Sequence, residues 1–449
     1  MAKQNGTAAK PPERAAERLP AYFLSLTLEN VRCFGPKQTL NLSTKDGKPA
    51  PWTIILGING TGKTTLLQSL AGFEPVFDTT VSTRPVPRHL FDSPVLLDPR
   101  SIDDSSTSEI RIRIGFDAQQ YRNAQAELFV RFDHEKMVLE LTDEHSPQPP
   151  YCFAYGAGRR VGNAALSEAE ADDPTATLFS DRAELRNPEE WLLQLDYAFA
   201  RTNDEEAKQR FNEAKELLLK IMPEGEVTDL RPVPGTGSHP KPRVEFETPY
   251  GWVPLRQLGY GYQTLVTWVA DLANRMAERY PNSPNPLHEP AVVLVDEIDL
   301  HLHPKWQRKL MSFLTGRFPN VQFIATAHSP LVAQAAADAN LAVLRREGDH
   351  VVIDNDLGHI RNWRIDQILT SDLFGLETAR PPQIEDKLRE RGKLLSKSKL
   401  TAKDQKRLSE LEAEIGELPM GETADEVRER EEIKKTLALL MSERKKAAP

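Results

Sequence analysis

The fold of this chain follows from one stretch, Gly57-Ile58-Asn59-Gly60-Thr61-Gly62-Lys63-Thr64. It fits G-x-x-x-x-G-K-[ST], the phosphate-binding loop of P-loop nucleotide hydrolases. Residues 53–56 before the loop predict a buried β-strand, and residues 65–71 after it predict a helix. A strand and a helix on either side favour a phosphate-binding loop over an ordinary glycine-rich turn.

The loop also predicts which residues bind nucleotide. Glycines let the backbone wrap an anion with inward-pointing N–H groups, and the helix N-terminus adds its positive end. We expect Lys63 to reach the β- and γ-phosphates of ATP and the Thr64 hydroxyl to ligate Mg²⁺. The predicted nucleotide-binding residues are Asn59, Gly60, Thr61, Gly62, Lys63, Thr64 and Thr65.

Composition limits the class of protein. The 449 residues are enough for one large domain with insertions or for two to three modules. No apolar run reaches about 18 residues, so we expect no membrane span. The two cysteines, Cys33 and Cys152, argue against a disulfide framework and favour the cytoplasm. The net charge of −9 does not support general nucleic-acid binding, although it is compatible with a local basic groove.

Two further strands predict the rest of the site. Residues 291–295 are an apolar run that ends in Asp296 and Glu297, as in a central parallel strand with ligand-binding acids at its carboxyl end. We expect Asp296 to hold the Mg²⁺ shell and Glu297 to polarise the attacking water; the alternative is a buried strand followed by solvated acids. Residues 321–327 predict another buried strand, which ends at His328. We expect His328 to contact the γ-phosphate, although a lone histidine often has a structural role.

The remaining chain divides into patterns of strands and helices. Alternating side chains predict an antiparallel β patch, and capping signals predict a helical hairpin inserted in the head. The patch strands are expected at 22–32, 39–42, 110–116, 126–132 and 137–141, and the helices at 188–201, 204–222 and 262–278. Residues 223–242 are rich in proline and glycine and predict a linker, followed by a short hairpin at 243–247 and 252–255.

These patterns predict five regions. They are a disordered tail (1–20), an N-terminal lobe with the P-loop (21–180), a helical insertion (181–224), a C-terminal lobe (225–378) and a charged helical region (379–449). The last region has helical patterns at 383–397, 402–416 and 424–445, and an apolar stripe through Leu408, Leu411, Ile415 and Leu418. The stripe is compatible with local packing or with a partner surface.

The order of motifs resembles that of ABC-type ATPases. Residues 258–263, Leu-Gly-Tyr-Gly-Tyr-Gln, open a helix between the P-loop and the acids, where the family has its Leu-Ser-Gly-Gly-Gln signature. They depart from it, with Gly259 for Ser and Tyr260 for the first Gly. Residues 28–34, 296–304 and 325–330 are similar to the RecF/SMC/OLD-like branch. Within that branch the chain resembles stand-alone anti-phage defence ATPases of the Septu and retron type (PtuA-like). It resembles the PARIS ATPase (AriA) almost as closely.

The resemblance implies an α/β fold: an ABC-type P-loop ATPase head with a mixed central sheet, flanking helices, an antiparallel β patch, a helical-hairpin insertion and C-terminal helices. It also implies that two heads pair around ATP, so that Gly259 and Gly261 contact the nucleotide of the partner copy. Arg159, after a strand at 152–154, is compatible with a phosphate contact or with a surface turn. His301 and His303 lack a third ligand at metal-binding spacing, and we expect structural roles for both.

The resemblance further implies an ATPase switch that controls a separate effector, such as a nuclease subunit. We expect no intrinsic nuclease domain, because the acids after His328 lie mostly in charged helical patterns. The alternative is a DNA-repair ATPase of RecF or SMC type, which would bind DNA directly. A transporter subunit is disfavoured by the altered signature and the C-terminal extension.

Overall fold

The computed structural model describes residues 20–76, 86–87, 107–116, 125–134, 138–141, 150–162, 173–202, 205–222, 226–236, 241–336, 338–356, 363–371, 373–376, 379–397 and 400–416. The predicted tail before residue 20 and the predicted helix at 424–445 lie outside these residues. The chain divides into two compact units, with the boundary between Gly375 and Leu376.

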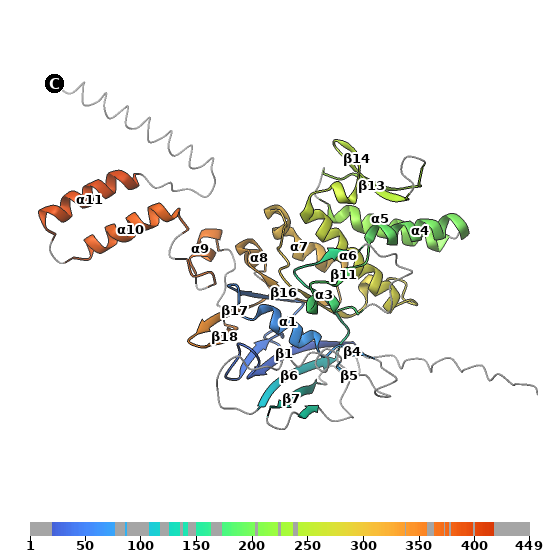
Figure 1. Cartoon of the computed structure of the whole chain (residues 1–449), viewed down its shortest axis with the longest axis horizontal. Helices are drawn as coiled ribbons and strands as arrows, with labels where there is room; N and C mark the ends of the chain where they lie inside the picture. The colour runs from blue at the N-terminus through green and yellow to red at the C-terminus, as the bar shows by residue number, and fades with distance from the viewer. Residues whose placement is uncertain are drawn as a thin grey trace, which may run out of the picture. The chain divides into compact units, whose positions relative to one another are not determined.

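A six-stranded central sheet organises the first unit (Figure 1). In spatial order its strands are β18 (His350–Asp354), β17 (Asn340–Glu347), β3 (Trp52–Gly57), β16 (Val321–Ala327), β15 (Ala291–Val295) and β9 (Cys152–Tyr155). All neighbours pair in parallel except β18, which is antiparallel to β17. Parallel pairing brings the carboxyl ends of β3, β15 and β16 to one edge, and the P-loop, Asp296 and His328 follow those ends.

The central sheet is buried on both faces, and strand alternation sorts its side chains into two cores. Along β16, Phe323 belongs to one core and Ile324 to the other. The first core includes side chains of α6 (Tyr260–Arg279) and α7 (Pro304–Arg317). The second includes α1 (Lys63–Ala71), which lies between the central sheet and the antiparallel sheet (Figure 1).

The predicted antiparallel patch is confirmed as a five-stranded sheet in the order β2-β1-β6-β7-β8. Its strands are β1 (Ala21–Glu29), β2 (Gln38–Asn41), β6 (Thr107–Phe116), β7 (Gln125–Asp133) and β8 (Val138–Leu141). Leu26 and Leu40 are cross-strand partners, and both are fully buried against the core that contains α1. The mixed sheet, flanking helices and antiparallel patch are the α/β architecture expected for this class of P-loop head.

The predicted helical hairpin is also confirmed, as α4 (Pro188–Thr202) and α5 (Glu205–Ile221). The Asn187 side-chain oxygen accepts a hydrogen bond from the Glu189 N–H at 3.0 Å and caps α4. Leu192 and Leu218 of the hairpin belong to the same core as Trp268 of α6. The hairpin therefore packs into the head.

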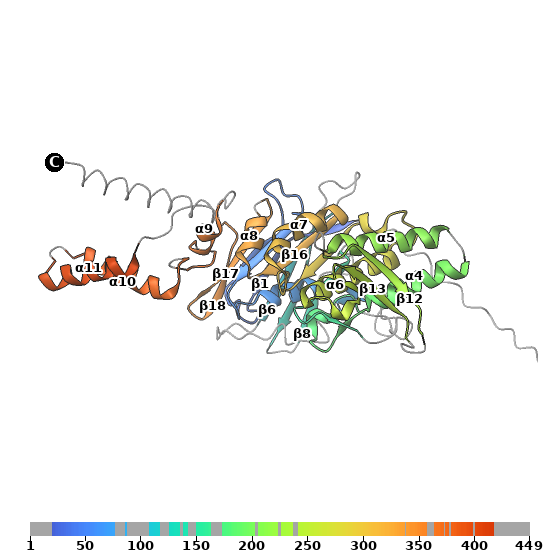
Figure 2. The same cartoon turned by 90° about the horizontal axis from the view of Figure 1, so that it is seen from above.

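The predicted linker at 223–242 is partly wrong, because it contains a strand, β12 (Asp229–Val233). β12 pairs with β13 (Arg243–Thr248), which pairs in turn with β14 (Gly251–Pro254), beside α4 and α5 (Figure 2). Pro232 is tolerated because β12 is an edge strand, where a missing N–H need not break the ladder. Leu230 is fully buried and supplies the apolar contact that holds the strand.

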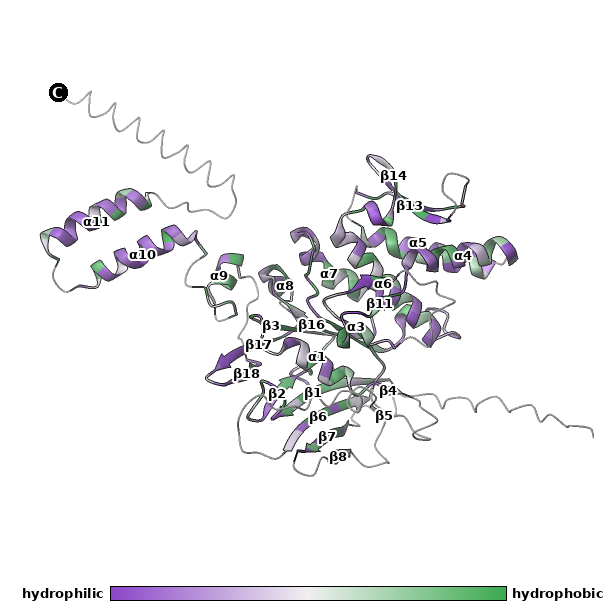
Figure 3. Cartoon of the chain, viewed as in Figure 1, coloured by the Kyte–Doolittle hydropathy of each residue, from purple (hydrophilic) through white to green (hydrophobic). Residues whose placement is uncertain are grey.

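The second unit contains a charged helical pair, α10 (Pro382–Leu395) and α11 (Ala402–Ile415), which are mostly purple in Figure 3. Arg407 binds the Glu390 carboxylate with two nitrogens at 2.8 Å, so ion pairing links the helices. Leu411 is fully buried, which shows local packing of the predicted apolar stripe at this position. Leu418 lies outside the described residues.

Short elements complete the described chain. They are β4 (Pro75–Val76), β5 (Val86–Pro87), β10 (Arg160–Val161), β11 (Glu184–Leu185), α3 (Ala176–Phe179), α8 (Pro330–Ala335), α9 (Ile365–Leu369) and the 3₁₀ turns η3 (Leu255–Gln257) and η4 (Pro286–His288). Among the helices in the described ranges, none combines the length and apolar character needed to cross a bilayer.

A buried polar network joins the end of β9 to α6. The Asp271 carboxylate accepts hydrogen bonds from the Tyr155 hydroxyl at 2.9 Å and from Arg275 Nε at 2.7 Å. Burial, together with the Asp271 charge, raises the pKa of Tyr155 well above its ordinary value, so the phenol stays protonated and donates. The network replaces water around a carboxylate whose side chain is 0% exposed.

Replacing Asp271 should therefore destabilise the head strongly. We expect Asp271→Ala to lower the free energy of unfolding by about 3–5 kcal/mol, because Arg275 loses the carboxylate that pairs it inside the protein. Glu278→Ala is the matched control on the same helix, since its ion pair with Arg186 is half-exposed and should cost less than about 1 kcal/mol. Chemical denaturation measures both, and equal losses would contradict this account.

Candidate functional site

The P-loop adopts a conformation that requires glycine at Gly62. This residue caps the N-terminus of α1 with φ 84°, in the left-handed region. A Cβ there would lie 2.5 Å from Cys33 Sγ and 2.9 Å from the Phe34 ring. Because the loop is pressed against these side chains, its backbone is already shaped before any ligand binds.

The ammonium group of Lys63 lies inside this loop. Its Nζ donates hydrogen bonds to the carbonyl oxygens of Gly57 at 2.8 Å and Ile58 at 3.0 Å. Burial lowers the pKa of Lys63 from its ordinary value, while the nearby charges of Asp296 and Glu297 oppose that shift. The cation is thus held by neutral acceptors that a phosphate oxygen, as a charged acceptor, can replace.

Asp296 connects the P-loop helix to the neighbouring strand. Its Oδ2 accepts a hydrogen bond from the Thr64 hydroxyl at 2.7 Å, and its Oδ1 accepts one from the Thr326 hydroxyl at 2.6 Å. Thr326 Oγ1 in turn accepts the Glu297 N–H at 2.7 Å. Thr64 and Asp296 therefore present hydroxyl and carboxylate oxygens side by side, the donor type that Mg²⁺ prefers.

Glu297 and His328 face each other beside this network. Glu297 Oε1 lies 3.8 Å from His328 Nε2, and each side chain is about one third exposed, at 33% and 35%. Glu297 has φ 48°, an uncommon conformation for this residue, and the Asp299 carboxylate accepts the His328 N–H at 3.0 Å. His328 Nε2 is a buried atom without a hydrogen-bond partner among the described residues, and it faces the Glu297 carboxylate.

The buried guanidinium of Arg159 binds the main chain of the two acids. The alternative of a surface turn is wrong, because Arg159 is only 3% exposed. Its Nη1 donates to the Asp296 carbonyl at 2.6 Å and its Nη2 to the Glu297 carbonyl at 2.8 Å. Burial lowers the pKa of Arg159 to about 10, which leaves the guanidinium charged at neutral pH. Sequence reasoning missed this clamp, since it joins segments that lie far apart in the chain.

A cavity of about 350 Å³ lies between the P-loop and the two acids. It is lined by Arg32, Cys33, Asn59, Gly60, Gly62, Lys63, Thr64, Thr65, Asp296 and Glu297. The structure thus brings most of the predicted P-loop residues together with both predicted acids. Sequence reasoning assigned no role to Arg32, Cys33 or Thr326, although all three lie in stretches that resemble the RecF/SMC/OLD-like branch.

The signature-like segment, residues 258–263, begins α6. A Cβ on Gly261 would lie 2.1 Å from the carbonyl oxygen of His301, so glycine is required by packing within the chain. The Tyr260 and His301 rings meet edge to face at 4.8 Å. His303 Nδ1 accepts the Lys305 N–H at 3.3 Å and caps α7, a structural role. Contact of Gly259 and Gly261 with a partner's nucleotide stays a prediction.

The chain is similar to several known proteins. A family model described as "AAA domain, putative AbiEii toxin, Type IV TA system" matches residues 53–333, more than half of the chain. The Septu protein PtuA of Bacillus mycoides (strain KBAB4) is 26% identical over 79% of this chain and 45% of that protein. The retron Ec83 probable ATPase of Escherichia coli is 36% identical over 34% of this chain and 27% of that protein. The predicted resemblance to Septu and retron ATPases is confirmed.

The chain spans less than half the length of either curated relative. Among solved structures, the SMC head domain from Thermotoga maritima is 15% identical with a TM-score of 0.40, over 75% of this chain and 98% of that one.

The Thr326 hydroxyl should contribute to the stability of the fold, whereas the Thr53 hydroxyl should not. Both threonines are fully buried in adjacent strands, but Thr53 Oγ1 has no hydrogen-bond partner among the described residues. We expect Thr326→Val to lower the free energy of unfolding by about 2 kcal/mol, because Asp296 loses a donor and the Glu297 N–H loses its acceptor. Thr53→Val should be neutral or stabilising. Thermal and chemical denaturation compare the two, and a larger loss in Thr53→Val would refute the assignment.

Proposed function

This chain belongs to the family described as "AAA domain, putative AbiEii toxin, Type IV TA system", and we propose that it binds ATP with Mg²⁺ and hydrolyses it to ADP and phosphate. One observation carries the proposal. The Thr64 hydroxyl and the Asp296 carboxylate meet at 2.7 Å beside the buried Lys63, at the carboxyl edge of a parallel sheet. The names of two relatives, both "probable ATPase", support it.

Each residue has a separate task in this proposal. The P-loop N–H groups and the N-terminus of α1 bind the phosphates, and Lys63 exchanges its two carbonyl partners for phosphate oxygens. Thr64 and Asp296 hold Mg²⁺, which when bound neutralises charge on the β- and γ-phosphates. Glu297 orients and deprotonates the attacking water, and His328 Nε2 donates to the γ-phosphate.

We further propose that two copies close around ATP and that this state controls a separate effector, a nuclease, in anti-phage defence. The likeness to Septu and retron proteins supports the defence role. The signature-like segment supports pairing, since Gly259 opens a helix whose N–H groups can meet a phosphate of the partner copy. In this arrangement the partner copy completes the site, so hydrolysis opens the pair and resets the effector.

Glu297→Gln should separate binding from hydrolysis. The amide keeps the shape of the side chain but cannot take a proton, so we expect ATP turnover to fall at least about a hundredfold while ATP affinity is retained. Glu347→Gln, on an exposed strand end, is the matched control and should leave turnover unchanged. Phosphate release and equilibrium ATP binding measure the two effects. Normal turnover in Glu297→Gln would show that another group is the base.

Lys63→Ala should instead weaken ATP binding itself. A charged hydrogen bond is worth roughly 1.5–3 kcal/mol, so we expect about a 10- to 100-fold loss of affinity. Lys305→Ala, which removes an exposed ammonium from α7, serves as control. Isothermal titration with ATP and Mg²⁺ measures both, and unchanged affinity in Lys63→Ala would rule out the P-loop assignment.

Pairing and effector control are tested with the Glu297→Gln protein. With ATP and Mg²⁺ we expect light scattering to report a dimer or a larger assembly that reverts when nucleotide is removed. Affinity capture from the native host should recover a nuclease in a fixed ratio to this chain. Recovery of DNA without a protein partner would instead favour a DNA-repair ATPase.

A further inference from the structure

Glu297 has a backbone conformation that its surroundings must enforce. Its φ of 48° lies in the left-handed region, which costs free energy for a residue that carries a side chain. Such a conformation persists only where the surrounding structure fixes it. Because peptide groups are planar, the orientations of the two peptide groups on either side of Glu297 set its φ and ψ. The contacts of these two groups therefore decide where the Glu297 side chain points.

Arg159 and Thr326 hold both peptide groups, each from one side. The carbonyl oxygens, those of Asp296 and Glu297, accept hydrogen bonds from Arg159 Nη1 at 2.6 Å and Nη2 at 2.8 Å. The N–H groups, those of Glu297 and Ile298, donate to Thr326 Oγ1 at 2.7 Å and to the Thr326 carbonyl at 2.9 Å. Arg159 thus supplies the carbonyl half of the clamp on Glu297, and Thr326 supplies the N–H half.

The planar fork of arginine suits this double contact. A guanidinium presents several N–H donors in a fixed plane, whereas lysine carries a single ammonium group on a flexible stem. Arg159 is buried, so water does not compete for its two bonds to the carbonyls. The guanidinium charge also interacts with the carboxylates of Asp296, Glu297 and Asp299, and it offsets the repulsion among them.

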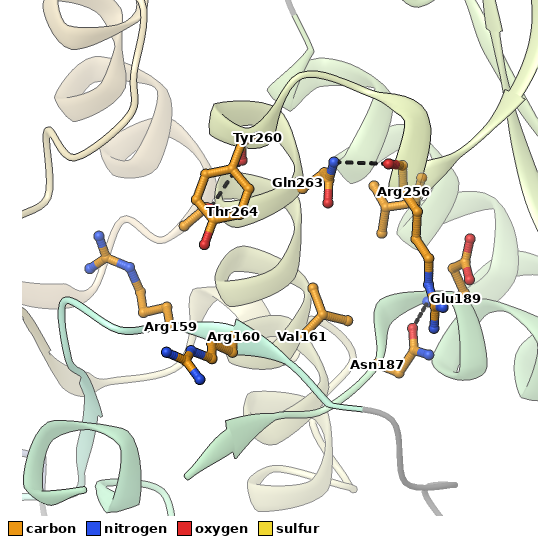
Figure 4. A pocket seen from close by; sticks show the side chains of 10 residues that line it. Arg159, Arg160, Val161, Asn187, Glu189, Arg256, Tyr260, Gln263 and Thr264 are labelled. Carbon is orange, nitrogen blue, oxygen red and sulfur yellow. Dashed lines mark hydrogen bonds between the residues drawn. The ribbon is translucent and has the colours of Figure 1, made fainter. Parts of the chain in front are cut away.

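Arg159 lies outside the set of residues that line the cavity between the P-loop and the acids. It lines instead a separate cavity of about 320 Å³, shown in Figure 4, where the side chains of Arg159 and Arg160 point in different directions. Any influence of Arg159 on the reaction must therefore pass through the acids. Of these, Glu297 has its Oε1 3.8 Å from His328 Nε2.

We propose that Arg159 is a positioning residue for ATP hydrolysis. Its two hydrogen bonds fix the left-handed main chain of Glu297 and so direct the carboxylate toward the attacking water, without contact between Arg159 and ATP. The inference rests on the proposed ATPase function. It adds a residue that sets kcat but not the affinity for ATP.

Arg159→Lys in the full chain tests the fork, because it keeps the charge but loses the planar pair of donors. The Glu297 carbonyl still accepts the Leu300 N–H at 3.0 Å, so the turn should loosen without unfolding. We expect kcat to fall about ten- to a hundredfold, since a misplacement of about 1 Å can have such an effect. The affinity for a non-hydrolysable ATP analogue should stay the same. Turnover is counted per analogue-binding site, so that unfolded chains do not lower it.

The matched control is Arg182→Lys, which changes an exposed arginine and should alter neither kcat nor affinity. Arg159→Ala adds a second test, because it leaves space for a free guanidinium ion. Guanidinium chloride, at concentrations far below those that unfold the protein, should restore part of kcat in Arg159→Ala. Sodium chloride at the same concentration should not.

Amide hydrogen exchange reports the clamp directly and needs no ATP hydrolysis. In Arg159→Lys we expect faster exchange at the Glu297 and Ile298 N–H groups, with unchanged exchange at Ile324 inside the ladder of β16. Arg182→Lys should leave all three rates as they are.

Three results would each overturn the proposal. They are unchanged kcat per binding site in Arg159→Lys, unchanged exchange at Glu297, and equal effects of sodium and guanidinium chloride on Arg159→Ala. Absence of hydrolysis in the wild-type protein would instead refute the proposed ATPase, and the exchange rates would still test the clamp. Normal wild-type hydrolysis with an unaffected Arg159→Lys protein would refute only the role of Arg159.

Discussion

The structure depends on the two hydrogen bonds that the Asp296 carboxylate accepts. One comes from Thr64 at the start of α1 and the other from Thr326 at the end of β16. The first residue follows β3 and the second lies in β16, so this side chain links two elements that the pairing of β3 with β16 already places side by side. Because Thr326 also accepts the Glu297 N–H, the position of Glu297 depends on the same hydrogen-bond network.

Much of this arrangement was predictable because it is encoded locally. A parallel strand buried on both faces must be an apolar run, and the residues after it fall at the ligand-binding edge. That reasoning located β3, β15 and β16 and brought Lys63, Thr64, Asp296 and Glu297 to one cavity. Helix caps are also local, and Asn187 marked the start of α4 for that reason.

What escaped prediction depends on contacts between distant segments. β12 contains Pro232 and lies within a glycine- and proline-rich stretch, so only its pairing with β13 reveals a strand. The polar contacts of Arg159 are to main-chain carbonyls of residues far along the sequence, and a carbonyl leaves no trace in residue identity.

The close approach of Gly261 to His301 couples the position of α6 to that of the turn after the acids. Helix α6 touches the turn after the acids through bare backbone, and no flexible side chain lies between them to absorb movement. A displacement of that turn is therefore transmitted to α6 almost rigidly. Near its middle α6 is tied to β9 through Asp271 and Tyr155, and α4 and α5 pack against its side. Helix α6 thus connects the turn after the acids with the helical hairpin formed by α4 and α5.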